Sequence, residues 1–473
     1  MKSHSKRSKT LEAAPAAAED AVGRMATRPV GRLLWENCVQ TIASVGMFGF
    51  YALTNAWFVS HGVGDQAMAA VNLVAPLLLL LGAVSTTVGA GGATLVSRAL
   101  GTGDERAASR AAGNAFTLFW VTAAVTTVAG LVFIDPLLNV LGATGSLHED
   151  ARQYAVILLC GSLSYTGFSA LVRAEGRVGF STRMWIGAIV VQIVLDPLLI
   201  FGLGLGVSGA AWGTVGGQTV SAVMSWWFFF ARRQRPYRVR LADLRPHAMT
   251  LRKLVGIGLP SFLANIGLTA LAVLVNSTLA VTGGAMALTA YVVCSRLQTF
   301  AVMPHTGMSQ GLQPIVSYNA GRGLDTRVAR TRALALRASL VYGAATAILL
   351  TVLAEPLVGI FVSGGEAAEE ARFALCVIAV GGIVIGIAPL IAGYFQALGR
   401  PLPAYVLTIG SLILLKAPLV VVCGLVWGTR GVWFGLAAGE FVTAASALLL
   451  LHRVDRRTPP PAPDRLAASR DVR

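Results

Sequence analysis

The chain has 473 residues, of which 55% are hydrophobic and only 13% are charged, and its formal net charge is +16. Soluble proteins carry about 25% charged residues, so this composition excludes a soluble globular protein and indicates one that crosses a membrane many times. The basic residues are spread through short loops with no single basic face, which argues against a nucleic-acid-binding protein. The cysteines form no CxxC pair, so we interpret them as packing residues: Cys38, Cys160, Cys294, Cys376 and Cys423.

The two ends of the chain differ in composition from its apolar centre. Residues 1–32 open with a basic run but lack the apolar stretch of a secretory signal, and residues 453–473 are rich in Pro, Arg and Asp. Segments of this kind cannot bury enough apolar surface to fold. Both ends are therefore predicted to be disordered cytoplasmic tails.

Between the tails lie twelve apolar segments that recur about every 35 residues, the length of one membrane-spanning helix and a short loop. In chain order they cover residues 37–60, 66–97, 112–134, 151–172, 184–206, 209–231, 255–282, 286–318, 336–354, 372–397, 402–426 and 431–452. The segments have helical length and no alternating pattern of barrel strands. We predict an all-α integral membrane protein with twelve transmembrane helices.

The loops between these segments are charged asymmetrically. When the loops are numbered alternately, one side of the membrane receives 33 of the 38 Lys and Arg residues. The opposite side receives only Arg152, Arg372 and Arg430, and two further cations, Arg296 and Lys416, lie inside segments. By the positive-inside rule, we predict a multi-pass protein of the cell (cytoplasmic) membrane with both termini in the cytoplasm.

An internal repeat emerges when the second half of the chain is aligned with the first so that position 355 matches position 135. Asp135-Pro136-Leu137 then aligns with Glu355-Pro356-Leu357, and, with a slip of one residue, Pro197-Leu198 aligns with Pro418-Leu419. The repeated unit has six helices, an even number, so both copies have the same orientation and are related by an axis along the membrane normal. We predict an N-terminal six-helix bundle at residues 33–231, a basic cytoplasmic linker at 232–253 and a C-terminal six-helix bundle at 254–452.

Five motifs stand out within residues 33–452. The two longest are MPHTGMSQGLQPIVSYNAG, at 303–321, and LDPLLIFGLGLGVSGAAWGT, at 195–214. The shorter ones are SRALGTGD at 97–104, RAEG at 173–176 and FQALG at 395–399. In this order the motifs resemble those of the multidrug and toxic compound extrusion (MATE) transporters. The resemblance implies a V-shaped pair of six-helix bundles that exports amphipathic, often cationic compounds in exchange for protons or sodium ions.

The resemblance also implies a cation-coupling site in the first half of the chain. In related transporters this site combines a carboxylate of the first helix, an Asn and an Asp one turn apart in the fifth helix, and groups of the sixth. The corresponding positions here are Asn55, Gln192, Asp196, Ala210 and Thr214. Asp196 and Thr214 match the family pattern, but the amide of Asn55 replaces the first-helix carboxylate, so one of two negative charges is absent.

The missing charge bears on which ion drives transport. A sodium ion without its water shell needs several oxygen ligands and nearby negative charge, so the loss of one carboxylate weakens the case for sodium. Asp196 still suits a proton carrier, because protonation removes a charge that is costly to hold inside a membrane. Gln192 precedes Asp196 by four residues and shares its helix face. We prefer proton coupling, with a structural role for Asp196 as the alternative.

Other polar and aromatic residues within the segments are candidates for the substrate cavity. Aromatic rings stack on flat cations with about 0.5 to 2 kcal/mol each. The acid and base of the last two segments are interpreted as an ion pair that stabilises the second bundle, with a substrate or proton role as the alternative. His305 is interpreted as a packing residue with a satisfied ring. The cavity candidates are Trp57, Tyr165, Trp212, Asn276, Gln310, Gln313, Arg296, Lys416 and Glu440.

Several other functions compete with drug export. A flippase for lipid-linked or polysaccharide cargo shares the fold and tends to have a cationic cavity, so Arg296 and Lys416 keep this alternative open. A major facilitator transporter is disfavoured because its basic motif after the second helix is absent. Membrane enzymes need clustered carboxylates or a nucleophile with a base, and ATP-driven pumps need a phosphate loop; neither pattern occurs. We predict a transporter and not an enzyme, without cofactor or metal, whose partners are small organic substrates and the lipid bilayer, with no nucleic acid and no obligate protein partner.

Overall fold

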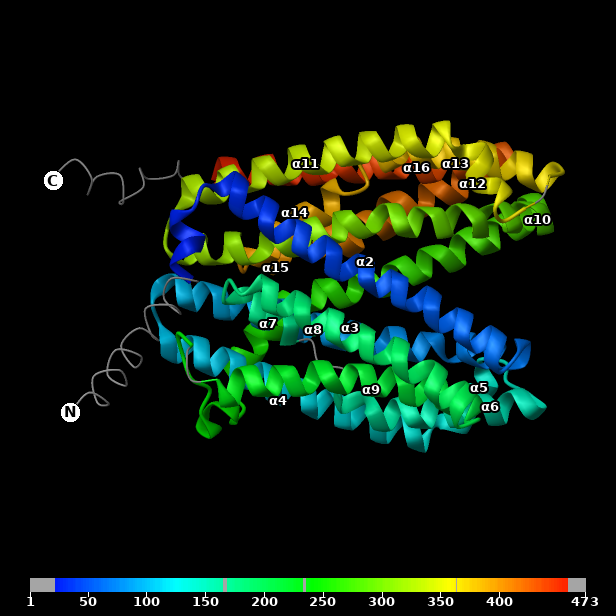
Figure 1. Cartoon of the computed structure of the whole chain (residues 1–473). Helices are drawn as coiled ribbons and strands as arrows, with labels where there is room; N and C mark the ends of the chain where they lie inside the picture. The colour runs from blue at the N-terminus through cyan, green and yellow to red at the C-terminus, as the bar shows by residue number, and fades with distance from the viewer. Residues whose placement is uncertain (1–21, 165–167, 233–234, 363, 458–473) are drawn as a thin grey trace, which may run out of the picture. The chain divides into compact units, whose positions relative to one another are not determined.

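A computed structural model of the chain describes residues 22–164, 168–232, 235–362 and 364–457. Within these ranges the regular structure is helical and contains no strand (Figure 1). A helix satisfies its backbone donors and acceptors internally, which the lipid interior requires. The predicted all-α fold is confirmed.

The helices of the chain are named in order, with η for short 3-10 or π-helical segments. The first half contains α2 (Val30–Gly62), α3 (Asp65–Thr102), α4 (Glu105–Val132), α5 (Ile134–Val140), α6 (Gly145–Cys160), η1 (Gly161–Ser164), α7 (Phe168–Ala174), α8 (Val178–Pro197), η2 (Leu198–Gly202), α9 (Gly206–Trp226), η3 (Trp227–Ala231) and η4 (Leu241–Leu244). The second half contains α10 (Ala248–Gly321), α11 (Asp325–Val352), α12 (Ala354–Gly359), α13 (Glu366–Gly382), α14 (Ile387–Ala397), α15 (Pro401–Tyr405), η5 (Val406–Gly410), η6 (Leu412–Lys416) and α16 (Ala417–Arg457).

Eight helical stretches of the described chain are long and apolar enough to cross a membrane. Two of these are long enough for two crossings, and each bends at a glycine with a positive φ: Gly284 at 59° in α10 and Gly428 at 65° in α16. Glycine adopts such angles without steric cost, so each long stretch holds two successive spans. With α2 and α9, which have 33 and 21 residues, the twelve predicted spans are accounted for.

Both predicted tails are shorter than the sequence indicated. Residues 22–27 are helical and Met25 is only 1% exposed, although residues 1–32 were predicted to be disordered. At the other end α16 continues to Arg457, and Asp455 pairs with Arg332 at 2.9 Å, although disorder was predicted from residue 453. The prediction is wrong for these residues. Their local composition favours disorder, but packing against the rest of the protein and pairing of charges hold them in helices. The rest of both tails, 1–21 and 458–473, lies outside the described residues.

The chain divides into two compact units whose limits differ from the predicted bundles. Unit 1 comprises Met1–Arg28 and Ala43–Leu259, and unit 2 comprises Pro29–Ile42 and Pro260–Arg473. The division therefore falls inside α2 and α10. The beginning of α2 belongs to unit 2, and the linker with the beginning of α10 belongs to unit 1.

Close backbone contacts explain this division. In unit 2, a Cβ atom built at Gly311 of α10 would lie 3.0 Å from the Cα of Cys38 in α2. In unit 1, a Cβ atom at Gly91 of α3 would lie 2.1 Å from the carbonyl oxygen of Leu254 in α10. Glycine lets membrane helices approach this closely. Gly91 and Gly311 are equivalent positions in the alignment of the two repeats. Both units therefore have a glycine at the same place, where it lets two helices pack closely.

The internal repeat is visible in two further pairs of contacts. Arg152 donates to Asp135 in unit 1 with an N–O distance of 3.2 Å, and the equivalent pair in unit 2, Arg372 and Glu355, lies 3.6 Å apart. Both pairs join the first turn of a short helix to the helix that follows it. The alignment that matches Glu355 to Asp135 also matches Arg372 to Arg152, which supports duplication of one six-helix unit.

Each unit has its own apolar core. The core of unit 1 includes Val74, Tyr154 and Ala210, from α3, α6 and α9. The core of unit 2 includes Leu279 of α10 and Trp433 of α16. Two separate cores allow each unit to be a stable body in its own right.

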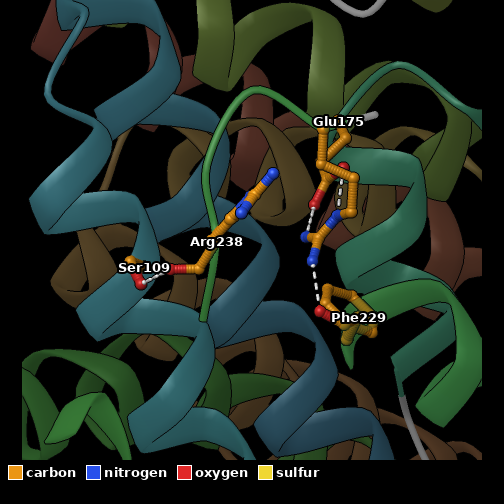
Figure 2. Close-up of polar contacts among 5 residues, drawn as sticks. Ser109, Glu175, Phe229 and Arg238 are labelled. Carbon is orange, nitrogen blue, oxygen red and sulfur yellow. Dashed lines mark hydrogen bonds and ion pairs between the residues drawn. The ribbon is translucent and has the colours of Figure 1, made fainter. Parts of the chain in front are cut away.

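The linker between the halves is fixed to unit 1 by hydrogen bonds from α4. The Ser109 hydroxyl donates to the carbonyl oxygen of Arg238 at 2.6 Å (Figure 2). The Thr117 hydroxyl donates to the carbonyl oxygen of Leu244, also at 2.6 Å. These bonds satisfy linker carbonyls that helix or sheet partners do not reach. The basic segment predicted at 232–253 is thus bound to unit 1, and we call it the strap. Its last residues form the start of α10.

A buried ion pair holds the strap from a second side. Arg235 donates from Nε to Glu175 Oε2 at 3.3 Å and from a terminal nitrogen to the carbonyl oxygen of Phe229 at 2.9 Å (Figure 2). Its guanidinium also lies 4.6 Å from the ring centre of Tyr237. Burial raises the pKa of Tyr237 well above its ordinary value, and the Glu175 carboxylate raises it further. Sequence reasoning missed this pair, because Arg235 is one of eight cations in the segment.

Candidate functional site

The candidate coupling site lies in unit 1, where α8 ends in an irregular turn. Asp196 is the penultimate residue of α8 and is 1% exposed. Pro197 follows and lacks an N–H, and the chain then continues as the π-helical segment η2. Single π-helical turns within α-helices are frequent at functional sites. The predicted buried carboxyl is therefore located beside a break in regular α-helix.

The two carboxyl oxygens of Asp196 have different surroundings. Asn55 of α2 donates from Nδ2 to Asp196 Oδ2 at 3.2 Å, and Asn55 is itself 7% exposed. The other carboxyl oxygen, Oδ1, is buried and has no hydrogen-bond partner among the described residues. A buried polar atom without a partner costs about 1 to 3 kcal/mol, so this oxygen is a natural position for a proton or a cation.

A second hydrogen bond completes the cluster beside the carboxyl. Gln192 of α8 donates from Nε2 to the Thr214 hydroxyl of α9 at 2.9 Å. Gln192 and Thr214 are 3% and 2% exposed, so water does not replace this bond. Gln192 and Asp196 lie on one helix face, and in the structure their hydrogen-bond partners are Thr214 and Asn55, respectively.

Glycines of α9 bring these groups together. A Cβ atom at Gly213 would lie 1.9 Å from Asp196 Oδ1, and one at Gly217 would lie 2.6 Å from the carbonyl oxygen of Ala188 in α8. The two glycines are one turn apart and form the small-residue stripe that lets membrane helices pack closely. The helices α8 and α9 lie side by side as a result (Figure 1). Ala210, the fifth predicted site residue, is fully buried in the apolar core of unit 1.

The electrostatics of this cluster are simple. Its four polar residues carry one ionisable group, Asp196, and the others are amides and a hydroxyl. Among the described residues, Asp196 forms no ion pair with a Lys, Arg or His. When ionised, its charge must therefore be balanced by something that the cluster itself does not contain.

The predicted cavity residues are distributed over both units. Four are exposed, namely Trp57, Trp212, Asn276 and Arg296, and two are half-buried, Gln310 and Gln313. Tyr165 lies outside the described residues. Trp57 and Trp212 belong to unit 1, and the other four described residues belong to unit 2. The polar coupling residues, in contrast, all lie within unit 1 and are joined there by hydrogen bonds.

The predicted ion pair of the last two spans is present in unit 2. Lys416, at the end of η6, donates from Nζ to Glu440 Oε1 of α16. The two side chains are 13% and 10% exposed. The interpretation of these residues as an interhelical pair is confirmed.

His305 of α10 also has the satisfied environment predicted for it. Its Nδ1 lies 3.0 Å from the hydroxyl oxygen of Ser339, and its ring meets the Tyr342 ring edge to face at 5.0 Å. A Cβ atom at Gly386 would lie 2.0 Å from Nδ1, so the ring packs against the chain between α13 and α14. His305 is therefore buried with one ring nitrogen bound to Ser339 and its ring packed on Tyr342, as expected of a packing residue.

Two known transporters resemble this chain in sequence. The FAD transporter of Shewanella oneidensis is 26% identical over 435 residues, which cover 90% of this chain and 95% of the relative. The multidrug export protein MepA of Staphylococcus haemolyticus is 26% identical over 412 residues, which cover 86% and 90%. The similarity extends over nearly the whole length in both cases.

Solved structures agree on the fold. A multidrug resistance MATE family transporter of the MOP superfamily, in an outward-facing conformation, superposes with a TM-score of 0.86 at 22% identity. A MOP superfamily transporter from Pyrococcus furiosus gives the same values. Each match covers 92% of this chain and 98% of the other.

The family model named MatE matches residues 41–198 and 260–422, more than half of the chain and equivalent parts of both repeats. The first match ends two residues after Asp196, and the second includes Lys416. Members of this family are transporters and not enzymes. The twelve-span chain therefore belongs to the MatE family of multi-pass membrane transporters.

Proposed function

We propose that this protein is a secondary-active exporter of amphipathic, often cationic organic compounds, and that protons drive it through Asp196. The observation that carries the proposal is the buried carboxyl with one oxygen unpartnered among the described residues and no cation beside it. Such a group alternates between a neutral form, stable in the membrane, and a charged form that requires a positive ligand. Exchange of a proton for another cation follows directly from that requirement.

The ligand set favours the proton over sodium. Sodium binding takes several oxygen ligands and profits from more than one negative charge, and the cluster has the single carboxylate of Asp196. Asn55 occupies the first-helix position where a second carboxylate would add that charge, and its amide already donates to Asp196 Oδ2. A proton needs only one free carboxyl oxygen, which is what Oδ1 provides.

The relatives support an exporter of organic molecules. MepA is named as a multidrug export protein, and the relative from Shewanella oneidensis is named as a transporter of FAD. We infer that this protein exports a broad range of organic molecules. We also infer that both of its termini are in the cytoplasm, the orientation that the basic loops predict. The protein acts on small molecules in the bilayer without a resident cofactor or an obligate protein partner.

The test is efflux of ethidium from cells that lack other pumps. Wild type, Asp196→Asn and the matched control Asp135→Asn, an exposed acid at a helix end, are expressed to equal levels. Proton and sodium gradients are collapsed separately. We expect efflux by wild type and Asp135→Asn to stop with the proton gradient alone, and Asp196→Asn to be inactive. Undiminished efflux by Asp196→Asn, or loss of efflux with the sodium gradient alone, would show the proposal to be wrong.

A further inference from the structure

Unit 2 contains a second polar site within the membrane spans, the pair formed by Lys416 and Glu440. The Lys416 ammonium donates to Glu440 Oε1, and both side chains are close to nine-tenths buried. Two titratable groups on elements that pack against α16 have hydrogen-bond partners of their own. Tyr394 of α14 accepts from Arg332 at 3.4 Å, and Glu370 of α13 accepts from Trp433 at 2.6 Å. Among the described residues, Lys416 and Glu440 form ion pairs only with each other.

The repeat makes this pair the counterpart of the coupling site in unit 1. Lys416 is the residue that aligns with Asp196 when Glu355 is aligned with Asp135. Both residues also border a π-helical segment, since η2 follows Asp196-Pro197 and η6 ends at Lys416. The duplicated framework thus has an ionisable residue at the same place in both units, with opposite charge.

A second observation points to a ligand at the pair. The hydroxyl of Thr443 is buried and has no hydrogen-bond partner among the described residues. Thr443 follows Glu440 by three residues in α16 and therefore lies on the same helix face. A buried hydroxyl without a partner is uncommon, and it is free to accept from an N–H group that approaches Glu440.

The Lys416 side chain reaches Glu440 across a glycine. A Cβ atom at Gly439 would lie 2.9 Å from Lys416 Cγ, so the aliphatic stem rests directly on the backbone of α16. The ammonium is at the end of a flexible stem, and in the described part of the chain it donates to no acceptor other than Glu440. Such a lysine can withdraw from its partner without unfolding the helices around it.

We propose that Glu440 is a binding site for the positive group of a cationic substrate, and that Lys416 is the internal cation which the substrate displaces. When the substrate cation binds Glu440, one N–H bond of the Lys416 ammonium breaks, the electron pair stays on Nζ, and the proton passes to water. The site is neutral before the exchange, as ammonium and carboxylate, and neutral afterwards, as amine, carboxylate and substrate cation. No uncompensated charge enters the membrane, which would otherwise be costly.

This inference rests on the proposed export of cations and adds a proton release that does not pass through Asp196. One substrate cation in exchange for one proton makes the affinity of the site rise about tenfold for each unit of pH. An arginine at position 416 would retain the charge pair but could not release a proton. Lys416→Arg therefore separates an exchangeable pair from a purely structural one.

The experiment measures ethidium binding to purified protein in detergent, in weakly buffered solution with a pH indicator. The background is Asp196→Asn, so that the released protons do not come from the unit 1 site. We expect about one proton per bound ethidium. Adding Lys416→Arg should abolish the release and weaken binding about 100-fold, as for other interactions with a buried charge pair. Lys253→Arg, a loop substitution of the same kind, is the matched control.

Folding is monitored by thermal unfolding of each variant, and the double variant Lys416→Met/Glu440→Gln supplies a neutral pair of similar volume. This double variant should fold and release no proton. The inference is overturned if Lys416→Arg binds ethidium and releases protons like its parent, or if the neutral pair still releases a proton. Those results would leave the role of Asp196 intact. Failure of wild type to bind ethidium at all would instead contradict both this inference and the export of organic cations.

Discussion

The two units contain ionisable groups at equivalent places but neutralise them differently. In unit 1, the Asp196 carboxylate has an amide neighbour, Asn55, and one oxygen without a partner among the described residues. In unit 2, the Glu440 carboxylate is paired with Lys416 from the adjacent span. The acid of unit 1 must obtain its positive partner from outside the protein, whereas the acid of unit 2 has one built in.

This difference shows that duplication conserved the framework more strictly than the charges. Both units place glycines at close helix contacts and repeat the ion pair between a short helix and the next span. Helix packing requires small residues wherever backbones approach, so those positions tolerate little change. The charge of a polar site tolerates change if its partner changes too, which allows two units of one fold to bind different ligands.

The largest expected difference between the two sites is in stability. Lys416→Met leaves the Glu440 carboxylate buried without its partner and should lower the free energy of unfolding by about 3 to 5 kcal/mol. Asp196→Asn removes no counter-charge and should change it by less than about 1 kcal/mol. Denaturant titration in detergent measures both. Equal losses in the two variants would contradict the distinction between an open and an internally paired site.

A conversion of the first site into the second should reduce transport. Asn55→Lys places an ammonium beside Asp196 and makes the cluster internally neutral, like the pair of unit 2. We expect proton-driven ethidium efflux to fall about 100-fold, because the carboxylate no longer needs an external cation. Asn55→Met, of similar length but uncharged, is the control and should retain more activity. Full efflux by Asn55→Lys would argue that the charge of Asp196 is unimportant.

Glycine substitutions should affect the two sites unequally. The Gly213→Ala side chain would lie 1.9 Å from Asp196 Oδ1, a group fixed by its own short side chain. We expect a cost of about 1 to 3 kcal/mol from overpacking, together with loss of transport. At Gly439 the added atom meets the flexible stem of Lys416 at 2.9 Å, which can move aside, so the cost should be below about 1 kcal/mol. Thermal unfolding of both variants measures these costs. A larger loss of stability in Gly439→Ala than in Gly213→Ala would contradict the prediction.

The smallest expected effects concern two threonines. Thr214→Val removes the acceptor of the Gln192 amide and should cost about 1 kcal/mol or more, because a buried donor loses its partner. Thr443→Val removes a hydroxyl with no partner among the described residues and should leave stability nearly unchanged, while it weakens ethidium binding at Glu440. A marked loss of stability in Thr443→Val would indicate that this hydroxyl has a structural role.

Much of the site could be predicted from local sequence, and the rest could not. Gln192 and Asp196 share a face because four residues make about one helical turn, so their proximity needs no tertiary information. Asn55 is far from Asp196 in the chain, and its hydrogen bond depends on how α2 packs against α8. The buried pair of Arg235 and Glu175 is of the same kind, since no periodicity distinguishes either residue from other charges near the loops.

The twelve spans, the duplicated six-helix unit and the identity of the ionisable residues inside the spans can all be inferred without coordinates. These features follow from hydrophobicity, helical periodicity and a constant offset between the two halves, all of which are properties of the chain in one dimension. The tertiary structure decided which charges are paired and where the compact units begin and end. Pairing depends on distances between helices, and those are set by glycines such as Gly213 and Gly311, where the absence of a side chain allows one backbone to approach another.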